Sequence, residues 1–128
     1  MRVLVCGSRT FSDRQFIWDV LRSQKIHGVD VVIEGGAAGA DLSAARWALA
    51  NEVEHQRYEA EWHQRGKSAG VIRNQRMLDE GKPDVVFAFV DKPLTESKGT
   101  ADMVRRALAA GIRTYVIVAA TSNGETTA

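Results

Sequence analysis

Four short runs rich in Val and Ile divide this chain, and each is continuously apolar rather than alternating with polar residues. They occupy residues 3–6, 31–33, 85–90 and 115–118. Continuous runs of this length are typical of strands that are covered on both faces, as in parallel sheets. A fifth run, at residues 53–58, is more polar and suits an edge of the same sheet.

Helical patterns fill the segments between these runs. Ser12 and Gln15 predict a capping box at the start of the first helix. The apolar positions of the predicted helices are Phe16, Ile17, Val20 and Leu21; Leu42, Ala45, Trp47 and Leu49; Val71, Ile72, Met77 and Leu78; and Met103, Val104, Ala107 and Leu108. The alternation predicts an α/β fold: a single Rossmann-like domain with an open parallel five-stranded sheet in the order 3-2-1-4-5 and helices on both faces. We predict this domain over residues 1–120 and a flexible polar tail over 121–128.

Composition argues against several classes of protein. A chain of 128 residues suits one core, and a net charge of +1 with both signs interspersed argues against a large nucleic-acid surface. The lone Cys6 has no partner for an intramolecular disulfide, and no apolar run approaches the roughly 20 residues that span a membrane. His27, His55 and His63 lack metal-ligand spacing. We therefore expect a cytoplasmic protein with no membrane contact and no bound metal.

The predicted topology places a ligand site at the carboxyl ends of the strands, near the point where the strand order reverses. Gly7, Ser8 and Arg9 follow the first strand. The glycine permits close approach of backbone amides to a ligand, and the arginine fork suits phosphate. The alternative is a strand-ending turn with a surface arginine.

A glycine-rich loop, GGAAGAD, follows the second strand from Gly35 to Asp41. Gly35 and Gly36 allow a tight turn, and Gly39 lets the next helix pack on the sheet and offer N–H groups to an anion. Asp41 is either the N-cap of that helix or the acceptor of a ribose hydroxyl, and the sequence leaves both roles open. The spacing is not that of the G-x-G-x-x-G dinucleotide motif.

Two further segments complete the predicted site. Gly99 and Thr100 precede a helix expected to begin near residue 101, and they offer a second small anion cradle unless Thr100 is only an N-cap. Arg73 and Asn74 lie within the first turn or so of the third helix, in reach of the same edge. Trp62 suits either base stacking or, more often, packing. Two glycine-containing helix starts at one edge favour a phosphate-bearing ligand.

Four blocks of sequence resemble a known superfamily: GSRTFSD, EGGAAGADLSAARWA, WHQRGKSAGVIRNQRM and KGTADMVRRALAAGI, in that order. Together they resemble the SLOG superfamily of Rossmann-like domains, in particular its small YspA-type branch, over nearly all of residues 1–118. The resemblance implies binding of a nucleotide or a nucleotide-derived ligand, such as ADP-ribose, NAD or a nucleoside monophosphate. It also implies a homodimer formed through helices beside the site.

The related LOG enzymes, which cleave the N-glycosidic bond of nucleoside 5′-monophosphates, suggest an enzymatic alternative. Arg73 with Met77, and the Gly-Thr pair at 99–100, resemble parts of the LOG motifs. An enzyme of this kind would use Arg73 and Asp102 as catalytic residues. However, Met103 stands where the LOG motif has its glutamate, and the neighbouring Asp102 would point about 100° away around the helix.

The DNA-processing protein DprA offers a second alternative, because its G-x-x-x-G-I-D block resembles residues 35–41. That resemblance implies a module that binds single-stranded DNA or a partner protein. Near-neutral net charge makes binding of nucleic acid the weaker expectation.

Overall fold

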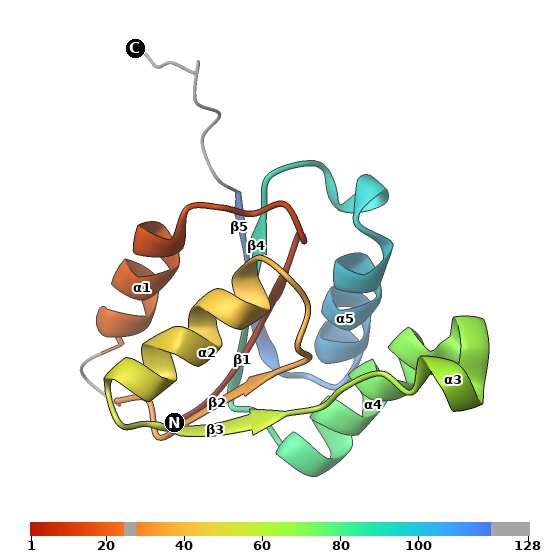
Figure 1. The fold of residues 1–128 in the computed structure, drawn as a ribbon, viewed down its shortest axis with the longest axis horizontal. Coiled ribbons are helices and arrows are strands. Elements are labelled where there is room, and N and C mark those ends of the chain that lie inside the picture. The colour runs from red at the N-terminus through yellow and green to blue at the C-terminus, as the bar shows by residue number, and fades with distance from the viewer. Residues whose placement is uncertain (25–27, 119–128) are drawn as a thin grey trace.

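The computed structural model describes residues 1–24 and 28–118 (Figure 1). Its strands are β1 (Arg2–Gly7), β2 (Val31–Glu34), β3 (Glu54–Arg57), β4 (Val85–Val90) and β5 (Arg113–Val118). The helices are α1 (Arg14–Arg22), α2 (Ala40–Ala50), α3 (Trp62–Arg65), α4 (Ala69–Gly81) and α5 (Lys98–Ala109), with 3₁₀ turns η1 (Gly66–Ser68) and η2 (Leu94–Glu96). The tail predicted at 121–128, and His27, lie outside the described residues.

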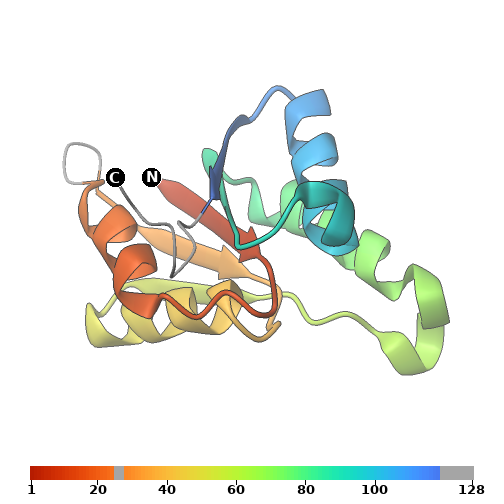
Figure 2. The same cartoon turned by 90° about the horizontal axis from the view of Figure 1, so that it is seen from above.

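The five strands pair in parallel in the order β3-β2-β1-β4-β5, which confirms the predicted Rossmann-like topology. β1 is central, with Leu4 opposite Ile33 of β2 and Val86 of β4. α1 and α2 cover one face of the sheet, and α4 and α5 cover the other (Figures 1 and 2). The strand order therefore reverses between β1 and β4, where this architecture places ligands.

Each face of the sheet has its own apolar core, because successive residues of a strand point to opposite faces. Val3 and Val5 pack in the same cluster as Ile17 of α1, whereas Leu4 packs in the cluster of Met77 from α4. All five side chains are almost completely buried. Burial on both faces explains why the strand segments are continuously apolar in the sequence.

α1 begins with a different cap from the predicted one. Asp13 Oδ1 accepts the N–H of Phe16 at 3.1 Å, so Asp13 rather than Ser12 is the N-cap. Gln15 Nε2 donates forward to Asp19 Oδ1 at 2.8 Å instead of back toward the cap. Two adjacent polar residues are both suitable caps, and the sequence pattern alone does not choose between them.

Six apolar residues that we predicted to face the core are exposed instead, most strongly Leu49 (83%), Val118 (67%) and Leu108 (59%). The other three are Val71, Tyr115 and Val116. In α2 the small side chains of Ala44 and Ala48 are buried against the sheet, which leaves Leu49 outside. β5 is an edge strand that pairs only with β4, and the more polar β3 forms the other edge, as predicted. No helix in residues 1–24 and 28–118 is long and apolar enough to cross a membrane.

Gly7 lies where β1 ends against the backbone of β4 and the start of α2. A Cβ atom there would overlap the carbonyl oxygen of Phe89 and lie 3.0 Å from the Cβ of Ala40. We expect Gly7→Ala to lower the free energy of unfolding by about 1–3 kcal/mol, as overpacking typically does. Urea denaturation measures this loss. Gly99→Ala is the matched control, because a Cβ there meets nothing within 4 Å; an equal loss in both variants would contradict the steric explanation.

Candidate functional site

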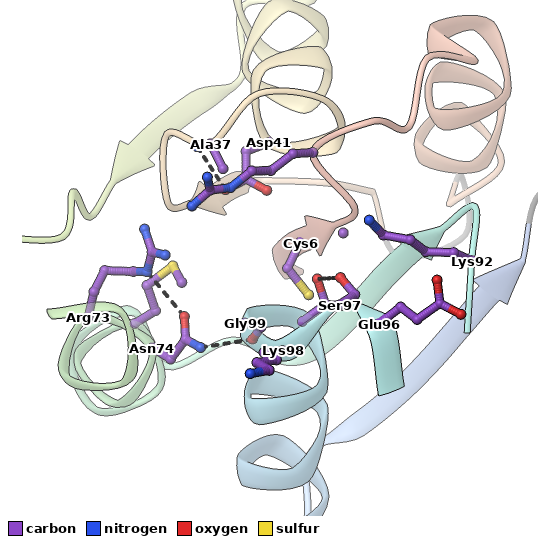
Figure 3. A pocket seen from close by; sticks show the side chains of 14 residues that line it. Cys6, Ala37, Asp41, Arg73, Asn74, Lys92, Glu96, Ser97, Lys98 and Gly99 are labelled. Atoms are coloured by element: carbon purple, nitrogen blue, oxygen red, sulfur yellow. Dashed lines mark hydrogen bonds between the residues drawn. The ribbon is translucent and has the colours of Figure 1, made fainter. Parts of the chain in front are cut away.

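A polar cavity of about 300 Å³ lies at the carboxyl ends of β1 and β4, beside the reversal in strand order (Figure 3). Its lining includes seven of the residues predicted for the site: Gly7, Arg9, Asp41, Arg73, Asn74, Gly99 and Thr100. The other lining residues are Cys6, Ala37, Met77, Lys92, Glu96, Ser97 and Lys98. The predicted residues outside the lining are Ser8, Gly35, Gly36, Gly39 and Asp102.

The glycine-rich loop directs its first amides toward the protein's own carboxylates. The N–H groups of Gly35 and Ala37 donate to Asp41 Oδ2, at 2.9 and 3.2 Å. The N–H of Gly36 donates to Glu34 Oε1 at 2.5 Å. We predicted that this loop would hold phosphate, but these three donors are already bonded. The loop therefore shapes the wall of the cavity, and a bound anion needs other donors.

Glu34, at the end of β2, is fully buried and links the glycine loop to β3. Its Oε2 accepts the Nε–H of Arg57 at 2.6 Å and lies 2.5 Å from His55 Nε2. A buried carboxylate is costly unless it is paired and hydrogen-bonded, and these partners meet that need. The sequence analysis missed this cluster. Its signal was a glutamate at the end of an apolar strand, with His55 and Arg57 two residues apart on a polar edge strand.

Asp41 lies at the start of α2 and is 5% exposed. Burial, followed by the negative charge of Glu34, raises the pKa of Asp41 to about 7, although hydrogen bonds from Ala37 and Gly35 and the charge of Arg73 act in the opposite direction. Oδ2 accepts the two loop amides, whereas Oδ1 accepts no hydrogen bond from the described residues. Gly39 holds the N-cap position of α2, so of the two roles left open for Asp41 the N-cap role does not apply. Its contact with ribose stays a prediction.

Ser8 and two loop glycines hold the wall of the site together. Gly39 has a φ of 82°, and a Cβ there would overlap the carbonyl oxygen of Ser8. Ser8 is buried, and its N–H donates to Phe89 O at 2.9 Å. A Cβ at Gly35 would overlap the guanidinium of Arg73. These three residues therefore support the cavity from outside its lining.

Arg73 extends from α4 to the glycine loop. Its Nη1 donates to the carbonyl oxygens of Gly35 at 2.7 Å and Tyr58 at 3.4 Å. Its Nε donates to Asn74 Oδ1 at 3.1 Å (Figure 3). Nη2 makes no hydrogen bond with the described residues, and Arg73 lines the cavity. The guanidinium is thus held in place with one nitrogen left for a ligand.

Asn74 joins α4 to α5. Its Nδ2 donates to Gly99 O at 3.1 Å and to Asp102 Oδ2 at 3.0 Å. Asp102 also accepts from Arg105 Nη2 at 2.6 Å and Arg106 Nε at 2.8 Å. Partial burial raises the pKa of Asp102, but the hydrogen bonds from Asn74 and Arg106 outweigh it, so that the pKa lies below its usual value. A carboxylate held ionised outside the lining is poorly suited to donate a proton to a leaving base.

α5 begins at Lys98, earlier than predicted, so that Gly99 and Thr100 lie in its first turn. Ser97 holds the N-cap position without a side-chain bond to the helix amides, and its Oγ donates to Thr100 Oγ1 at 3.1 Å instead. The first-turn amides of a helix have no partner within that helix, and they attract anions. The predicted anion cradle at 99–100 therefore coincides with a helix N-terminus that lines the cavity.

Cys6 and Met77 are the largest apolar side chains in the lining of the cavity. Burial, followed by the charge of Asp41, raises the pKa of the Cys6 thiol far above its usual range, so the sulfur stays protonated and suits packing rather than attack. Trp62 is 52% exposed and does not line the cavity. Within the described residues, no group of three or more His, Cys, Asp or Glu side chains is placed to hold a metal ion.

Comparisons with known proteins give two matches. The model of a family described as "YspA, cpYpsA-related SLOG family" matches residues 1–64. A protein of Mycobacterium phage D29, named Gene 61 protein, is 42% identical over 119 residues, which covers 87% of this chain and 91% of the phage protein. The family match includes β1, the glycine loop and Asp41, and the similarity to the phage protein extends over most of the chain.

Proposed function

Because the chain belongs to the YspA, cpYpsA-related SLOG family, we propose that its cavity binds a nucleotide or a nucleotide-derived ligand of the nucleoside monophosphate, ADP-ribose or NAD type. Membership of this family fits a nucleotide-related binding role. The observation that carries the proposal is the convergence of four cationic side chains on one small cavity. These are Arg9, Arg73, Lys92 and Lys98, and only two acidic side chains, Asp41 and Glu96, accompany them.

The phosphate group is proposed to bind at the N-terminus of α5 rather than at the glycine loop. Lys98, Gly99 and Thr100 form the first turn of this helix and line the cavity. Amides of a first helical turn favour an anion, and nearby cationic side chains strengthen the attraction. The glycine loop contributes the opposite wall, because its amides at 35–37 already bind the carboxylates of Glu34 and Asp41.

Asp41 is proposed to accept a hydroxyl of the ligand sugar through Oδ1. The carboxyl group lines the cavity and is fixed by the two loop amides that bind its other oxygen. Such a fixed acceptor loses little conformational entropy on binding. The geometry of the site therefore offers cations and amides for phosphate on one side and a carboxyl oxygen for a hydroxyl on the other.

The two alternatives have less support. A phosphoribohydrolase would need a proton donor, and Asp102 is ion-paired and outside the lining. Extended binding of single-stranded DNA usually uses a long basic groove with aromatic platforms, whereas the cations here surround a single cavity of about 300 Å³. The homodimer implied by the family resemblance also stays a proposal, which light scattering in solution tests.

Arg9→Gln is expected to weaken binding of AMP or ADP-ribose about tenfold, because it removes one charge-assisted contact to phosphate. Arg9 is exposed and lines the cavity, so the variant should keep the stability of the native protein. Isothermal titration calorimetry measures the affinity. Arg22→Gln, at the end of α1 and outside the cavity, is the matched control and should bind as the native protein does.

The midpoint temperature of thermal unfolding, measured with and without nucleotide, tests the proposal as a whole. A ligand that binds only the folded state raises it by mass action. We expect an increase with at least one of AMP, ADP-ribose and NAD at millimolar concentration. No increase with any of them would contradict nucleotide binding, and equal weakening in Arg9→Gln and Arg22→Gln would contradict the assigned location.

A further inference from the structure

The lining of the cavity contains no aromatic side chain: of the fourteen described residues that form it, the largest apolar ones are Cys6 and Met77. Bases are commonly bound by stacking on aromatic rings or between apolar side chains. Both aromatic residues near α4 are placed elsewhere. The guanidinium carbon of Arg76 lies over the ring of Tyr58, 5.4 Å from the ring centroid. Trp62 packs near Gly70. The cavity therefore lacks a platform for a base.

The same lining is well supplied with groups for a phosphorylated sugar. Cations approach from four segments: Arg9 after β1, Arg73 on α4, Lys92 after β4 and Lys98 at the start of α5. The hydroxyl groups of Ser97 and Thr100 lie beside the amides of the first turn of α5. Phosphate oxygens accept hydrogen bonds from all of these groups.

The opposite wall provides an acceptor for sugar hydroxyls. Asp41 is 5% exposed, and its Oδ1 has no hydrogen-bond donor among the described residues. Among the described residues, Ser43 Oγ is the only fully enclosed side-chain nitrogen or oxygen atom that lacks a hydrogen-bond partner. Asp41 Oδ1 also lacks a partner among them and is therefore not fully enclosed, and Asp41 lines the cavity, so Oδ1 is open to it. A site built to receive a hydroxyl group discriminates strongly against ligands that lack it.

The size of the cavity also favours a phosphorylated sugar over a base. Its volume of about 300 Å³ is at the lower end of the range of about 300–1,000 Å³ for small-molecule sites. A phosphate and a pentose use most of such a space, and a base attached to that pentose would extend beyond the lining. Contacts with the base would then contribute little to affinity.

From this combination we infer that the cavity recognises the 5′-phosphorylated pentose of its ligand and is indifferent to the base. The inference rests on the proposed function and makes it more specific. Ribose 5-phosphate is then the smallest complete ligand. Nucleoside monophosphates with different bases bind with similar affinity, and nucleosides without phosphate do not bind appreciably.

Calorimetric titration of the full chain with ribose 5-phosphate, AMP, CMP, adenosine and inorganic phosphate tests this inference. We expect the first three to bind with dissociation constants within about threefold of one another, and adenosine and phosphate at least about tenfold more weakly. Trp62→Ala should leave all five affinities unchanged, because Trp62 is outside the lining. Arg9→Gln should weaken the three sugar phosphates by the same factor.

The outcomes separate the inference from the proposed function. If AMP binds and ribose 5-phosphate does not, or if AMP and CMP differ about tenfold or more, the base is recognised and the inference fails while nucleotide binding stands. If inorganic phosphate binds as tightly as ribose 5-phosphate, the sugar is not recognised and the inference also fails. If none of the phosphorylated compounds binds, the inference fails, and the proposed function fails with it when ADP-ribose and NAD also leave the midpoint of thermal unfolding unchanged.

Discussion

Replacing Glu34 with alanine is expected to lower the free energy of unfolding by about 3 kcal/mol. The substitution removes the acceptor of the Gly36 amide and leaves His55 and Arg57 without their shared carboxylate. It also leaves a void where a fully buried side chain stood. His55 and Arg57 are both about one third exposed, so water solvates them in the variant, and the expected loss is at the lower end of the range for a broken buried pair.

Urea denaturation of the Glu34→Ala protein measures this loss. Glu80→Ala is the matched control: its carboxylate pairs with Arg76 on the exposed surface of α4, where such pairs contribute about 0–1 kcal/mol. Glu34→Gln keeps the side-chain volume and an acceptor for the Gly36 amide, so it should lose less than the alanine variant. A loss below about 1 kcal/mol in Glu34→Ala would show that Glu34 does not anchor the glycine loop.

The fold was predictable because its determinants are local and repeated. Continuous apolar runs, separated by helical patterns, imply strands that are buried on both faces, and the connection rules then leave few topologies. Details that depend on tertiary packing were less accessible. Leu49 has the spacing of a core residue, but α2 packs through Ala44 and Ala48 instead. Similarly, the predicted strand order placed β5 at an edge correctly, but the exposure of its apolar side chains Tyr115, Val116 and Val118 was not predicted.

The candidate site was predictable in position and only in part in its interactions. Glycines at the ends of strands pointed to the edge of the sheet where the cavity lies, and Arg73 and Asn74 are among the residues that line this cavity. The sequence did not indicate which groups would use the loop amides. Glu34 lies in a buried strand, and its partners His55 and Arg57 come from β3, about 20 residues later. Pairing of this kind depends on strand register, which a single sequence does not specify.

Asp41→Asn is expected to make the protein more stable than the native form at pH 8. The pKa of Asp41 is about 7 in the folded protein, against an ordinary value of 3.8, chiefly because of burial and then because of Glu34. Between these two values the folded state binds a proton that the unfolded state has lost, so stability decreases as the pH rises through this interval. A difference of about 3 pH units corresponds to about 4 kcal/mol at most. Asparagine keeps an acceptor oxygen for the Gly35 and Ala37 amides and does not titrate.

Urea denaturation at pH 5 and pH 8 measures this effect, with Asp79→Asn on the exposed surface of α4 as the control. We expect the native protein and the control to lose stability between the two pH values by similar amounts, and Asp41→Asn to lose less. Because the charge of Glu34 contributes to the raised pKa of Asp41, Glu34→Gln should also move the pH-dependent loss toward lower pH. An Asp41→Asn protein with the same pH dependence as the native protein would mean that another group titrates in this interval. The two carboxyl groups that bind the glycine loop would then not be coupled to each other as their burial and proximity require.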